Sequence, residues 1–287
     1  SQRLRYGAIY VVVCSALKEW AQIYHGQILD MLERNVARKL TREELQEWQG
    51  PVFYLSHLAV ANPRSTSTPV RIVFNSSQVY RGYSLNKSLA KGPDSYLNSL
   101  TGVLLRWREE PVAMVADIRK MYNSIYIDSV EQHCHRFLWR DLDSTRDPEV
   151  YAITRVNMGD KPAGAISTEA IYKTADMFCE EYPEVATLLK SSTYVDDIVT
   201  SVHSDIQAQL LADDTDVVLG LAGFKVKSWL IGGRSKDSIA VEKVKVLGVD
   251  WLPASDEVSF TPSINFSQKK RGVHQCPDLL KDQIPGH

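Results

Sequence analysis

The chain has 287 residues, with 44% apolar and 24% charged side chains, which is ordinary for globular protein and excludes bulk disorder, collagen-like repeats and a small disulfide-dense scaffold. The formal net charge is −2, so the molecule as a whole has no attraction for nucleic acid. A site for a polyanion must therefore be local.

Charge is unevenly distributed along the chain. Residues 225–275 hold nine basic and five acidic side chains, a net +4, so the other residues together carry −6. The acidic excess outside residues 225–275 is consistent with acids concentrated in a cation site and equally with an ordinary mixed surface. Charge alone leaves both interpretations open.

The four cysteines are widely spaced, without a C-x-x-C pair, so we expect a reduced, intracellular protein, cytoplasmic or nuclear. His133-Cys134-His135 lacks the second ligand pair of a zinc finger, so we do not predict zinc there. No apolar run reaches the roughly 18–20 residues of a membrane span, and no membrane partner is expected. The stretch 7–17 resembles a signal-peptide core, but we predict a buried strand or helix.

The first part of the chain predicts helices followed by a hairpin. Apolar residues recur at three- and four-residue steps over 18–40, the signature of an amphipathic helix. Thr41 and Glu44 form a capping box that begins a second, short helix. Two apolar segments, 51–60 and 70–74, flank a polar loop with basic character and predict a β-hairpin.

Helices and strands alternate irregularly in the rest of the chain. Apolar spacing and caps predict helices over 94–109, 128–140, 162–181 and 204–221, and strands over 112–116, 150–156, 192–202, 241–251 and 258–261. We expect little order after residue 266. Because the regular βαβα alternation of a parallel sheet is absent, the prediction is an α+β fold with an antiparallel sheet.

Three acidic residues lie where carboxylates are costly. Asp117 ends the apolar run VAMVAD, and Asp196-Asp197 interrupt the apolar segment 192–202. A tight turn there would bring them beside Asp117, where a divalent cation would screen their repulsion. The alternative is an ordinary Asp-Asp turn. Clustered carboxylates with Mg²⁺ are the architecture of two-metal phosphoryl transfer.

The YVDD box at 194–197 and the VADIRKMY box at 115–122 resemble motifs C and A of reverse transcriptases. The segments PVFYLSHLAVANP, VRIVFNSS, SLNKSLAKGPDSYLNSLTGVLLRWRE, VNMGDKPAGAISTEA and VLGVDWLP resemble the BEL/Pao class of LTR retrotransposon polyproteins, over about residues 25–275. The resemblance implies right-hand polymerase fingers and palm. It implies an antiparallel palm sheet, RRM or ferredoxin-like, backed by helices, and fingers built from a β-hairpin plus helices.

The same resemblance implies a division of the chain into domains. We expect an N-terminal helical leader over 1–50 whose start need not be native, fingers over 51–92 and 128–148, palm including the primer grip over 93–127 and 149–261, and a tail over 262–287 without a thumb. A partner bearing a thumb and RNase H, or a homo-oligomer, is left open.

The resemblance also implies catalytic roles. Asp117 and Asp196 match the ligands shared by two Mg²⁺ ions, for which Mn²⁺ could substitute, and Asp197 matches the peripheral third carboxylate. These ions would lower the pKa of a primer 3′-hydroxyl and hold the triphosphate in line. Lys227, favoured slightly over Lys225, falls where motif D would protonate the pyrophosphate.

Other matches concern the incoming nucleotide. Tyr122 matches the aromatic steric gate under the sugar, with core packing as its alternative. Arg71 and Arg64 resemble a cationic pair that closes on the triphosphate, although a loop arginine such as Arg64 is most often solvated. Met158 and Gly159 match motif B, where glycine permits close backbone approach.

The primer grip and two departures complete the comparison with the family. Leu247, Gly248 and Val249 lie in text that resembles the primer grip, a hairpin that positions the primer end. Asn75 stands where the family implies aspartate, and residues 160–162 (Asp-Lys-Pro) replace the commoner serine-proline text.

The sequence therefore predicts an RNA-directed DNA polymerase core that extends a DNA primer with dNTPs on an RNA or DNA template. The principal alternative is a truncated or co-opted, non-catalytic nucleic-acid-binding or interaction module, which would lack much of the phosphate contact of a complete groove. An unrelated metal-dependent nuclease would explain the three acids but neither Tyr122 nor the primer-grip text.

Overall fold

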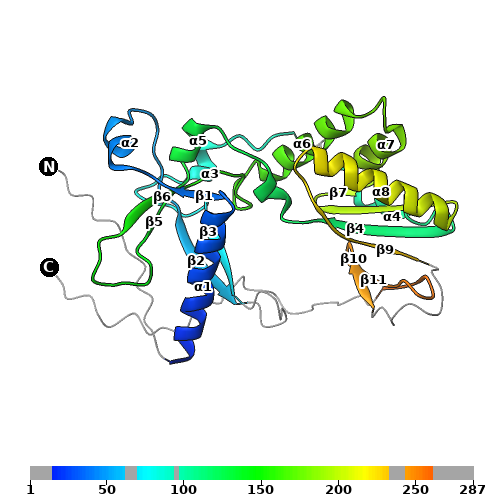
Figure 1. Ribbon diagram of the computed structural model, residues 1–287, viewed down its shortest axis with the longest axis horizontal. Helices are drawn as coiled ribbons and strands as arrows, with labels where there is room; N and C mark the ends of the chain where they lie inside the picture. The colour runs from blue at the N-terminus through cyan, green and yellow to red at the C-terminus, as the bar shows by residue number, and fades with distance from the viewer. Residues whose placement is uncertain (1–14, 62–69, 94–96, 233–242, 261–287) are drawn as a thin grey trace.

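The computed structural model describes residues 15–61, 70–93, 97–232 and 243–260. Its elements form two groups that lie side by side along the long axis (Figure 1). The three-stranded group is built around the sheet β1-β6-β5 and the hairpin β2-β3, and the four-stranded group around the sheet β7-β8-β4-β9. A further small sheet, β10-β11-β12, accompanies the four-stranded group.

The helices are α1 (Ser15–Glu33), α2 (Arg42–Glu47), α3 (Leu85–Ser88), α4 (Leu100–Arg106), α5 (Ser129–His133), α6 (Ala163–Met177), α7 (Pro183–Ser191) and α8 (Asp205–Leu221), with a 3-10 helix, η2, over Met121–Ser124. The strands are β1 (Ala37–Lys39), β2 (Ser56–Ala61), β3 (Val70–Asn75), β4 (Val112–Ile118), β5 (Arg136–Trp139), β6 (Glu149–Ile153), β7 (Thr193–Tyr194), β8 (Asp197–Val202), β9 (Val226–Ile231), β10 (Val244–Val246), β11 (Val249–Leu252) and β12 (Glu257–Ser259).

Every pairing between these named strands is antiparallel, which confirms the predicted α+β fold with antiparallel sheets. The predicted hairpin is present as β2 and β3, with Ser56 opposite Asn75. Its connecting loop, together with Arg64, lies outside the described residues. The capping box is also confirmed, because Thr41 accepts a hydrogen bond from the backbone N–H of Glu44 at 3.1 Å.

The core of the three-stranded group lies between α1 and the strands. Tyr24 and Ile28 on α1 contact a buried cluster that includes Phe74 of β3 and Phe137 of β5. The predicted helix over 18–40 is too long, since the chain leaves α1 through Asn35 at φ +54°. Residues 37–39 pair with β6 instead, because a strand there satisfies its backbone groups in the sheet.

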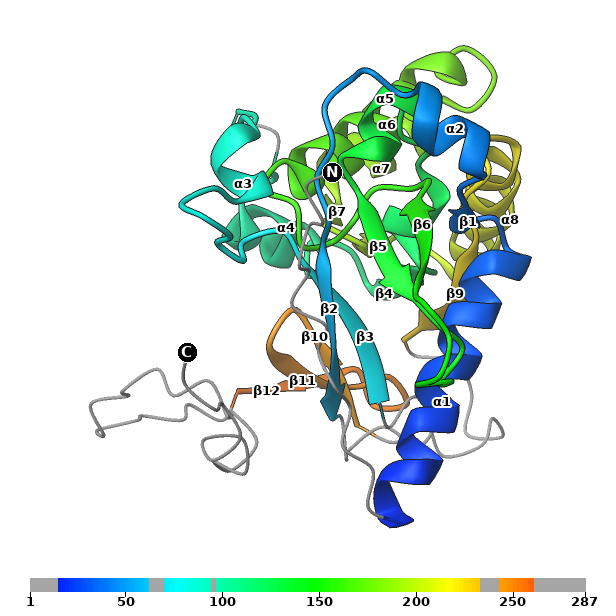
Figure 2. The same ribbon diagram turned by 90° about the vertical axis from the view of Figure 1, so that its left-hand side faces the viewer.

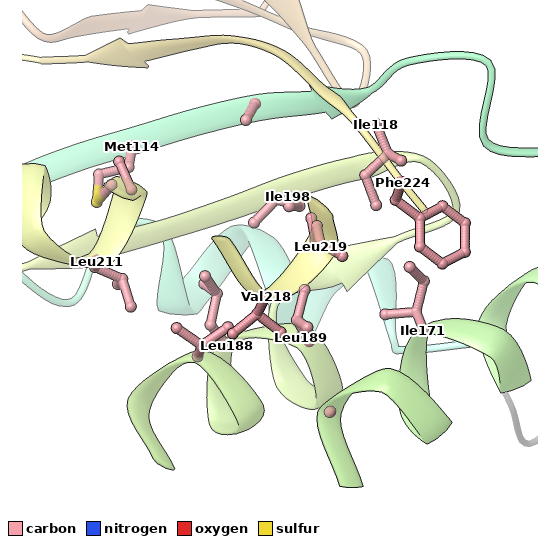
Figure 3. Close-up of a cluster of buried hydrophobic side chains, with 14 of the residues drawn as sticks. Met114, Ile118, Ile171, Leu188, Leu189, Ile198, Leu211, Val218, Leu219 and Phe224 are labelled. Carbon is pink, nitrogen blue, oxygen red and sulfur yellow. The ribbon is translucent and has the colours of Figure 1, made fainter. Parts of the chain in front are cut away.

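The four-stranded sheet is covered on both faces. Alternate residues of β4 point to opposite sides, so Met114, Ala116 and Ile118 face the core formed with α6, α7 and α8. Figure 3 shows Met114 and Ile118 in this cluster with Leu189 of α7. Val115, on the other face, joins the cluster of α4 and the β10-β11 hairpin. There the rings of Trp107 and Trp251 meet edge to face at 5.3 Å.

Several predicted boundaries are wrong where sheet pairing overrides local helical spacing. The helix predicted over 128–140 ends at His133, and residues 136–139 form β5 because they pair with β6. The helix predicted over 94–109 spans Leu100–Arg106 in the described residues. The strands expected over 241–251 form a hairpin, and helix α7 and strand β9 were not predicted. The segment 7–14 and the tail beyond residue 260 lie outside the description.

Sheet membership bears on the expected domain boundaries. Strand β6 pairs with β1 and β5, so residues 149–153 lie in the three-stranded group and not in the four-stranded sheet. Likewise, α1 and β1 of the expected leader are part of the core of the three-stranded group. The assignment of fingers and palm to these groups remains a prediction. None of the helices in the described residues is long and apolar enough to cross a membrane.

Leu189→Ala is expected to lower the free energy of unfolding by about 2–5 kcal/mol, because Leu189 is fully buried between α7 and the sheet and its truncation leaves a cavity. Leu210→Ala, on the outer face of α8 where the side chain is 59% exposed, is the matched control and should change the value by less than about 0.5 kcal/mol. Urea unfolding followed by circular dichroism measures both. Equal losses in the two variants would contradict this packing.

Candidate active site

The pairing of β4 with β8 brings the three predicted carboxylates to one end of the four-stranded sheet. Asp117 stands directly opposite Asp197 in the antiparallel register. The backbone N–H of Ile118 donates to the carbonyl of Asp196 at 2.8 Å, which keeps the turn beside the end of β4. By strand alternation, Asp117 and Asp197 share the sheet face of Val115 and Val199.

A two-residue turn presents Asp196. Tyr194 of β7 pairs with Asp197 of β8, so Val195 and Asp196 form the loop between the strands. The predicted tight turn is present, but one residue earlier than the expected Asp196-Asp197, because Asp197 belongs to β8. Val195 has φ +57°, a left-handed conformation that is strained for a β-branched residue and costs about 1–3 kcal/mol. The surrounding pairs of β7 and β8 hold the turn in this conformation.

A β-bulge directs Lys227 toward the carboxylates. Ala116 pairs with Trp229 and Ile118 with Val226, so two residues of β9 lie opposite Asp117 alone. Lys227, one of those two, places its Nζ 3.6 Å from Oδ2 of Asp117. The backbone carbonyl of Lys225 instead accepts from the N–H of Arg119 at 2.8 Å. Of the two candidate lysines, Lys227 therefore has the side chain with a carboxylate partner.

Burial and mutual repulsion make two of the carboxyl groups unusually weak acids. Burial, followed by the charges of Asp196 and Asp117, raises the pKa of Asp197 from 3.8 to about 6, and Lys227 opposes the shift. Burial also raises the pKa of Asp196, with a further contribution from Asp117. The carboxylates thus lie close enough to interact strongly, and a cation placed among them would relieve their repulsion.

The carboxylate oxygens of Asp117, Asp196 and Asp197 suit a hard cation, but they do not enclose a complete site for one. In the part of the chain that the structure describes, no three His, Cys, Asp or Glu side chains are grouped so as to hold a metal ion. Asp117 is 39% exposed in its side chain and interacts with Lys227. Mg²⁺ favours such open sites, because it keeps several waters and uses one or two protein carboxylates together with substrate phosphates.

Tyr122 lies beside the acidic turn. It belongs to η2, just after β4, and its side chain is hydrogen-bonded with Ser167 of α6. Burial and the charge of Asp196 raise the pKa of Tyr122, whereas the bond with Ser167 lowers it. The structure therefore brings Tyr122 close to Asp196, in a half-buried position that is compatible with either a steric gate or packing.

The loop that contains Met158 and Gly159 contacts the end of β3. Met158 is 72% exposed. A Cβ on Gly159 would lie 2.6 Å from the carbonyl oxygen of Phe74, so only glycine fits this approach. The close approach in this structure is to β3 itself. Arg71 is exposed on β3 in the three-stranded group, and no contact with the carboxylates is described for it.

A buried polar network that the sequence did not reveal holds this loop. Asp160 accepts from His135 Nε2 at 2.7 Å and from Asn157 at 3.0 Å, and it also accepts from Ser76 at the end of β3. Burial alone would lower the pKa of His135, but the bond and charge of Asp160 raise it. Burial would likewise raise the pKa of Asp160, yet His135 lowers it. The unusual Asp at position 160 was the only signal in the sequence.

The predicted primer-grip residues form the turn of the β10-β11 hairpin. Leu247 at φ +49° and Gly248 at φ +95° make the turn, and Val246 pairs with Val249. Leu247 and Val249 pack against the cluster of Trp107 and Trp251. The hairpin therefore lies on the sheet face that also carries Asp117 and Asp197.

Comparison with known proteins adds the fold family. No protein-family model and no curated protein matches the sequence. Among solved structures, the chain is similar to a foamy viral protease-reverse transcriptase in complex with an RNA/DNA hybrid, with TM-score 0.57 and 18% identity over 88% of this chain and 28% of that chain. It is also similar to a dRH form of that protein in complex with double-stranded DNA, with TM-score 0.55 and 18% identity over 80% of this chain and 33% of the other. The chain has a reverse-transcriptase-like fold and spans about a third or less of those proteins.

Asp197→Asn is expected to raise stability at neutral pH in the absence of divalent cations, by about 1 kcal/mol after solvent screening. Because the pKa of Asp197 is raised from 3.8 to about 6, the folded chain binds more protons than the unfolded chain between these two pH values. The free energy of unfolding of the unmodified chain therefore falls as the pH rises from 3.8 to about 6, and it should fall less steeply in the variant. Urea unfolding with a chelator present measures this, with Asp214→Asn on the exposed side of α8 as control. A variant with an unchanged slope would contradict the assignment.

Asp160→Asn is expected to cost about 3 kcal/mol or more, because it removes one partner of a buried charged pair. The ion pair should stabilise the fold at pH values between the lowered pKa of Asp160 and the raised pKa of His135. This stabilisation should be lost as the pH rises through the pKa of His135. Unfolding measured across this range should show that alkaline decline only in the unmodified chain. Glu149→Gln breaks the exposed pair with Lys39 and, as control, should cost less than about 1 kcal/mol. A similarly small loss for Asp160→Asn would refute the argument.

Proposed function

We propose that this chain is the fingers and palm core of an RNA-directed DNA polymerase of the BEL/Pao retrotransposon type. One observation carries the proposal: within a reverse-transcriptase-like fold, Asp117 lies opposite Asp197 and the turn presents Asp196 beside them. These are the positions at which the sequence resembles the catalytic boxes of that family.

Asp117 and Asp196, with Asp197 at the periphery, would hold two Mg²⁺ ions. When bound, such ions supply a lowered pKa for the primer 3′-hydroxyl and screening of the triphosphate charge. The raised pKa values of Asp196 and Asp197 support this assignment, because both groups gain most from a neighbouring cation.

The chain's own residues would order the reactants. The primer 3′-hydroxyl would lose its proton to water, and its oxygen would form a bond to the α-phosphorus of a dNTP while the bond from that phosphorus to the oxygen bridging to the β-phosphate breaks. Lys227, whose Nζ lies 3.6 Å from Asp117, would give a proton to the departing pyrophosphate. Tyr122, near Asp196, would lie under the sugar and disfavour a 2′-hydroxyl.

Contacts outside the carboxylates would hold the substrates. Arg71, with Arg64 of the adjoining loop, would bind phosphate oxygens through guanidinium hydrogen bonds. Met158 and Gly159 would contact the nucleotide, and the hairpin turn at Leu247–Val249 would support the primer end. The two similar proteins were solved with an RNA/DNA hybrid and with double-stranded DNA, which supports a nucleic-acid template and primer as partners here.

A second candidate is a non-catalytic module that binds nucleic acid through the same fold. It is favoured by two observations: Asp117 interacts with Lys227, and the carboxylates of the described residues are not grouped as a ready-made metal site. A chain in which a lysine neutralises Asp117 in this way would bind nucleic acid without incorporating nucleotides. The two candidates differ in whether the chain incorporates nucleotides at all.

Single-nucleotide extension of a labelled DNA primer on an RNA template, with Mg²⁺ or Mn²⁺, tests the proposal. The unmodified chain should add a nucleotide, and Asp196→Asn should reduce the rate by at least about 100-fold because a metal ligand is lost. Asp214→Asn, an exposed acid of α8, is the matched control and should extend normally.

Template-primer binding should be measured alongside by fluorescence anisotropy. Binding without incorporation in every chain would reject the polymerase and favour the non-catalytic module. Cleavage of nucleic acid without dNTPs that is lost in Asp196→Asn would instead favour a nuclease.

A further inference from the structure

A rigid tyrosine turn follows strand β3. The backbone N–H of Tyr80 donates to the carbonyl of Tyr83 at 2.8 Å, and that of Tyr83 donates back at 3.0 Å. The central residues, Arg81 at φ +50° and Gly82 at φ +87°, are both left-handed, as in the tight turns of two-residue hairpins. Lys87 Nζ also donates to the carbonyl of Gly82 at 3.3 Å. The turn is thus held in one shape.

This turn exposes aromatic surface to solvent. Tyr80 is 50% exposed and Tyr83 is 74% exposed. The guanidinium of Arg81 lies 5.4 Å from the centre of the Tyr80 ring. Exposed rings, one of them with a guanidinium over it, are the combination on which unpaired bases stack.

Every charged side chain of the segment 76–93, which contains the turn, is basic. Residues 76–93 contain three basic side chains, Arg81, Lys87 and Lys91, and no Asp or Glu, within a chain whose net charge is −2. Such a segment attracts a polyanion and repels a basic protein surface. A polyanion with flat, stackable groups matches both its charge and its rings.

Helix α3, which follows the turn, is bonded to the loop that contains Gly159. The backbone N–H of Asn86, in α3, donates to the backbone carbonyl of Ser76 at 2.9 Å. Its side chain donates to the carbonyl of Gly159 at 2.9 Å and accepts from the N–H of Lys161 at 2.7 Å. Figure 2 shows α3 at the margin of the molecule, beyond the central strands. Helix α3, whose Lys87 also bonds the turn at Gly82, is therefore tied to the loop that contains Gly159.

We infer that the turn Tyr80–Tyr83 is a stacking platform for the unpaired template strand. The template role rests on the proposed function, whereas the contact with single-stranded nucleic acid does not. A single strand is favoured over a duplex because the faces of paired bases are already covered by their neighbours. Stacking on tyrosine is tolerant of sequence, so the platform would accept every base.

The double variant Tyr80→Ala/Tyr83→Ala tests this platform. Fluorescence anisotropy should compare a labelled RNA-DNA duplex that has a 5′ template overhang of about eight nucleotides with a blunt duplex, at one fixed salt concentration, without dNTP or metal. The variant should bind the overhang substrate at least about 10-fold more weakly, and the blunt duplex within about twofold of the unmodified chain. Tyr80→Phe/Tyr83→Phe keeps the rings and should restore binding.

Two further measurements separate stacking from other causes. An overhang of sugar and phosphate without bases should bind more weakly and should not distinguish the alanine variant from the unmodified chain. Met177→Ala removes another exposed apolar side chain, 76% exposed on α6, and should leave all affinities unchanged.

Equal binding of the overhang by the alanine variant and the unmodified chain would overturn the inference, and so would equal losses on both duplexes. Because the assay requires no incorporation, a chain that fails the extension test can still show this contact. A failure of the proposed function is thereby distinguishable from a failure of the platform.

Discussion

The antiparallel pairing of β4 with β8 is the constraint on which the candidate site depends. Backbone hydrogen bonds along six residue pairs set the register that ends with Asp117 opposite Asp197. A shift of β4 by one residue would turn Asp117 to the face occupied by Ile118 and Ile198, against the helices and away from Asp197. The apolar residues that alternate along both strands resist that shift, so hydrophobic packing places the acids.

Electrostatic repulsion opposes this placement. Burial and neighbouring carboxylates raise the pKa of Asp196 and Asp197, and Val195 between the strands has a strained backbone. The bulge in β9 partly offsets the repulsion by bringing Lys227 to Asp117. In the proposed function, the same features that cost stability would favour a cation at this site.

Contact between the loop 157–161 and β3 couples the two structural groups. Gly159 allows the loop to approach Phe74, and the buried pair of Asp160 with His135 secures it from the other side. Asn86 then ties the loop to α3, the helix that follows the tyrosine turn. A template held at that turn and a nucleotide held at Met158 would thus contact a single connected framework.

The sequence by itself determined the α+β class, the hairpin of β2 and β3, the capped helix α2 and the acidic turn, because these depend on local periodicity and on turn and cap chemistry. It could not determine β1, β5 or β9, whose strand state depends on a distant partner that satisfies their backbone groups. Likewise, Asp160 could be seen as unusual, but its pairing with His135, 25 positions away, arises only when three loops meet. The choice of Lys227 over Lys225 as the partner of Asp117 was decided by a bulge, a feature of register between strands that no single segment encodes.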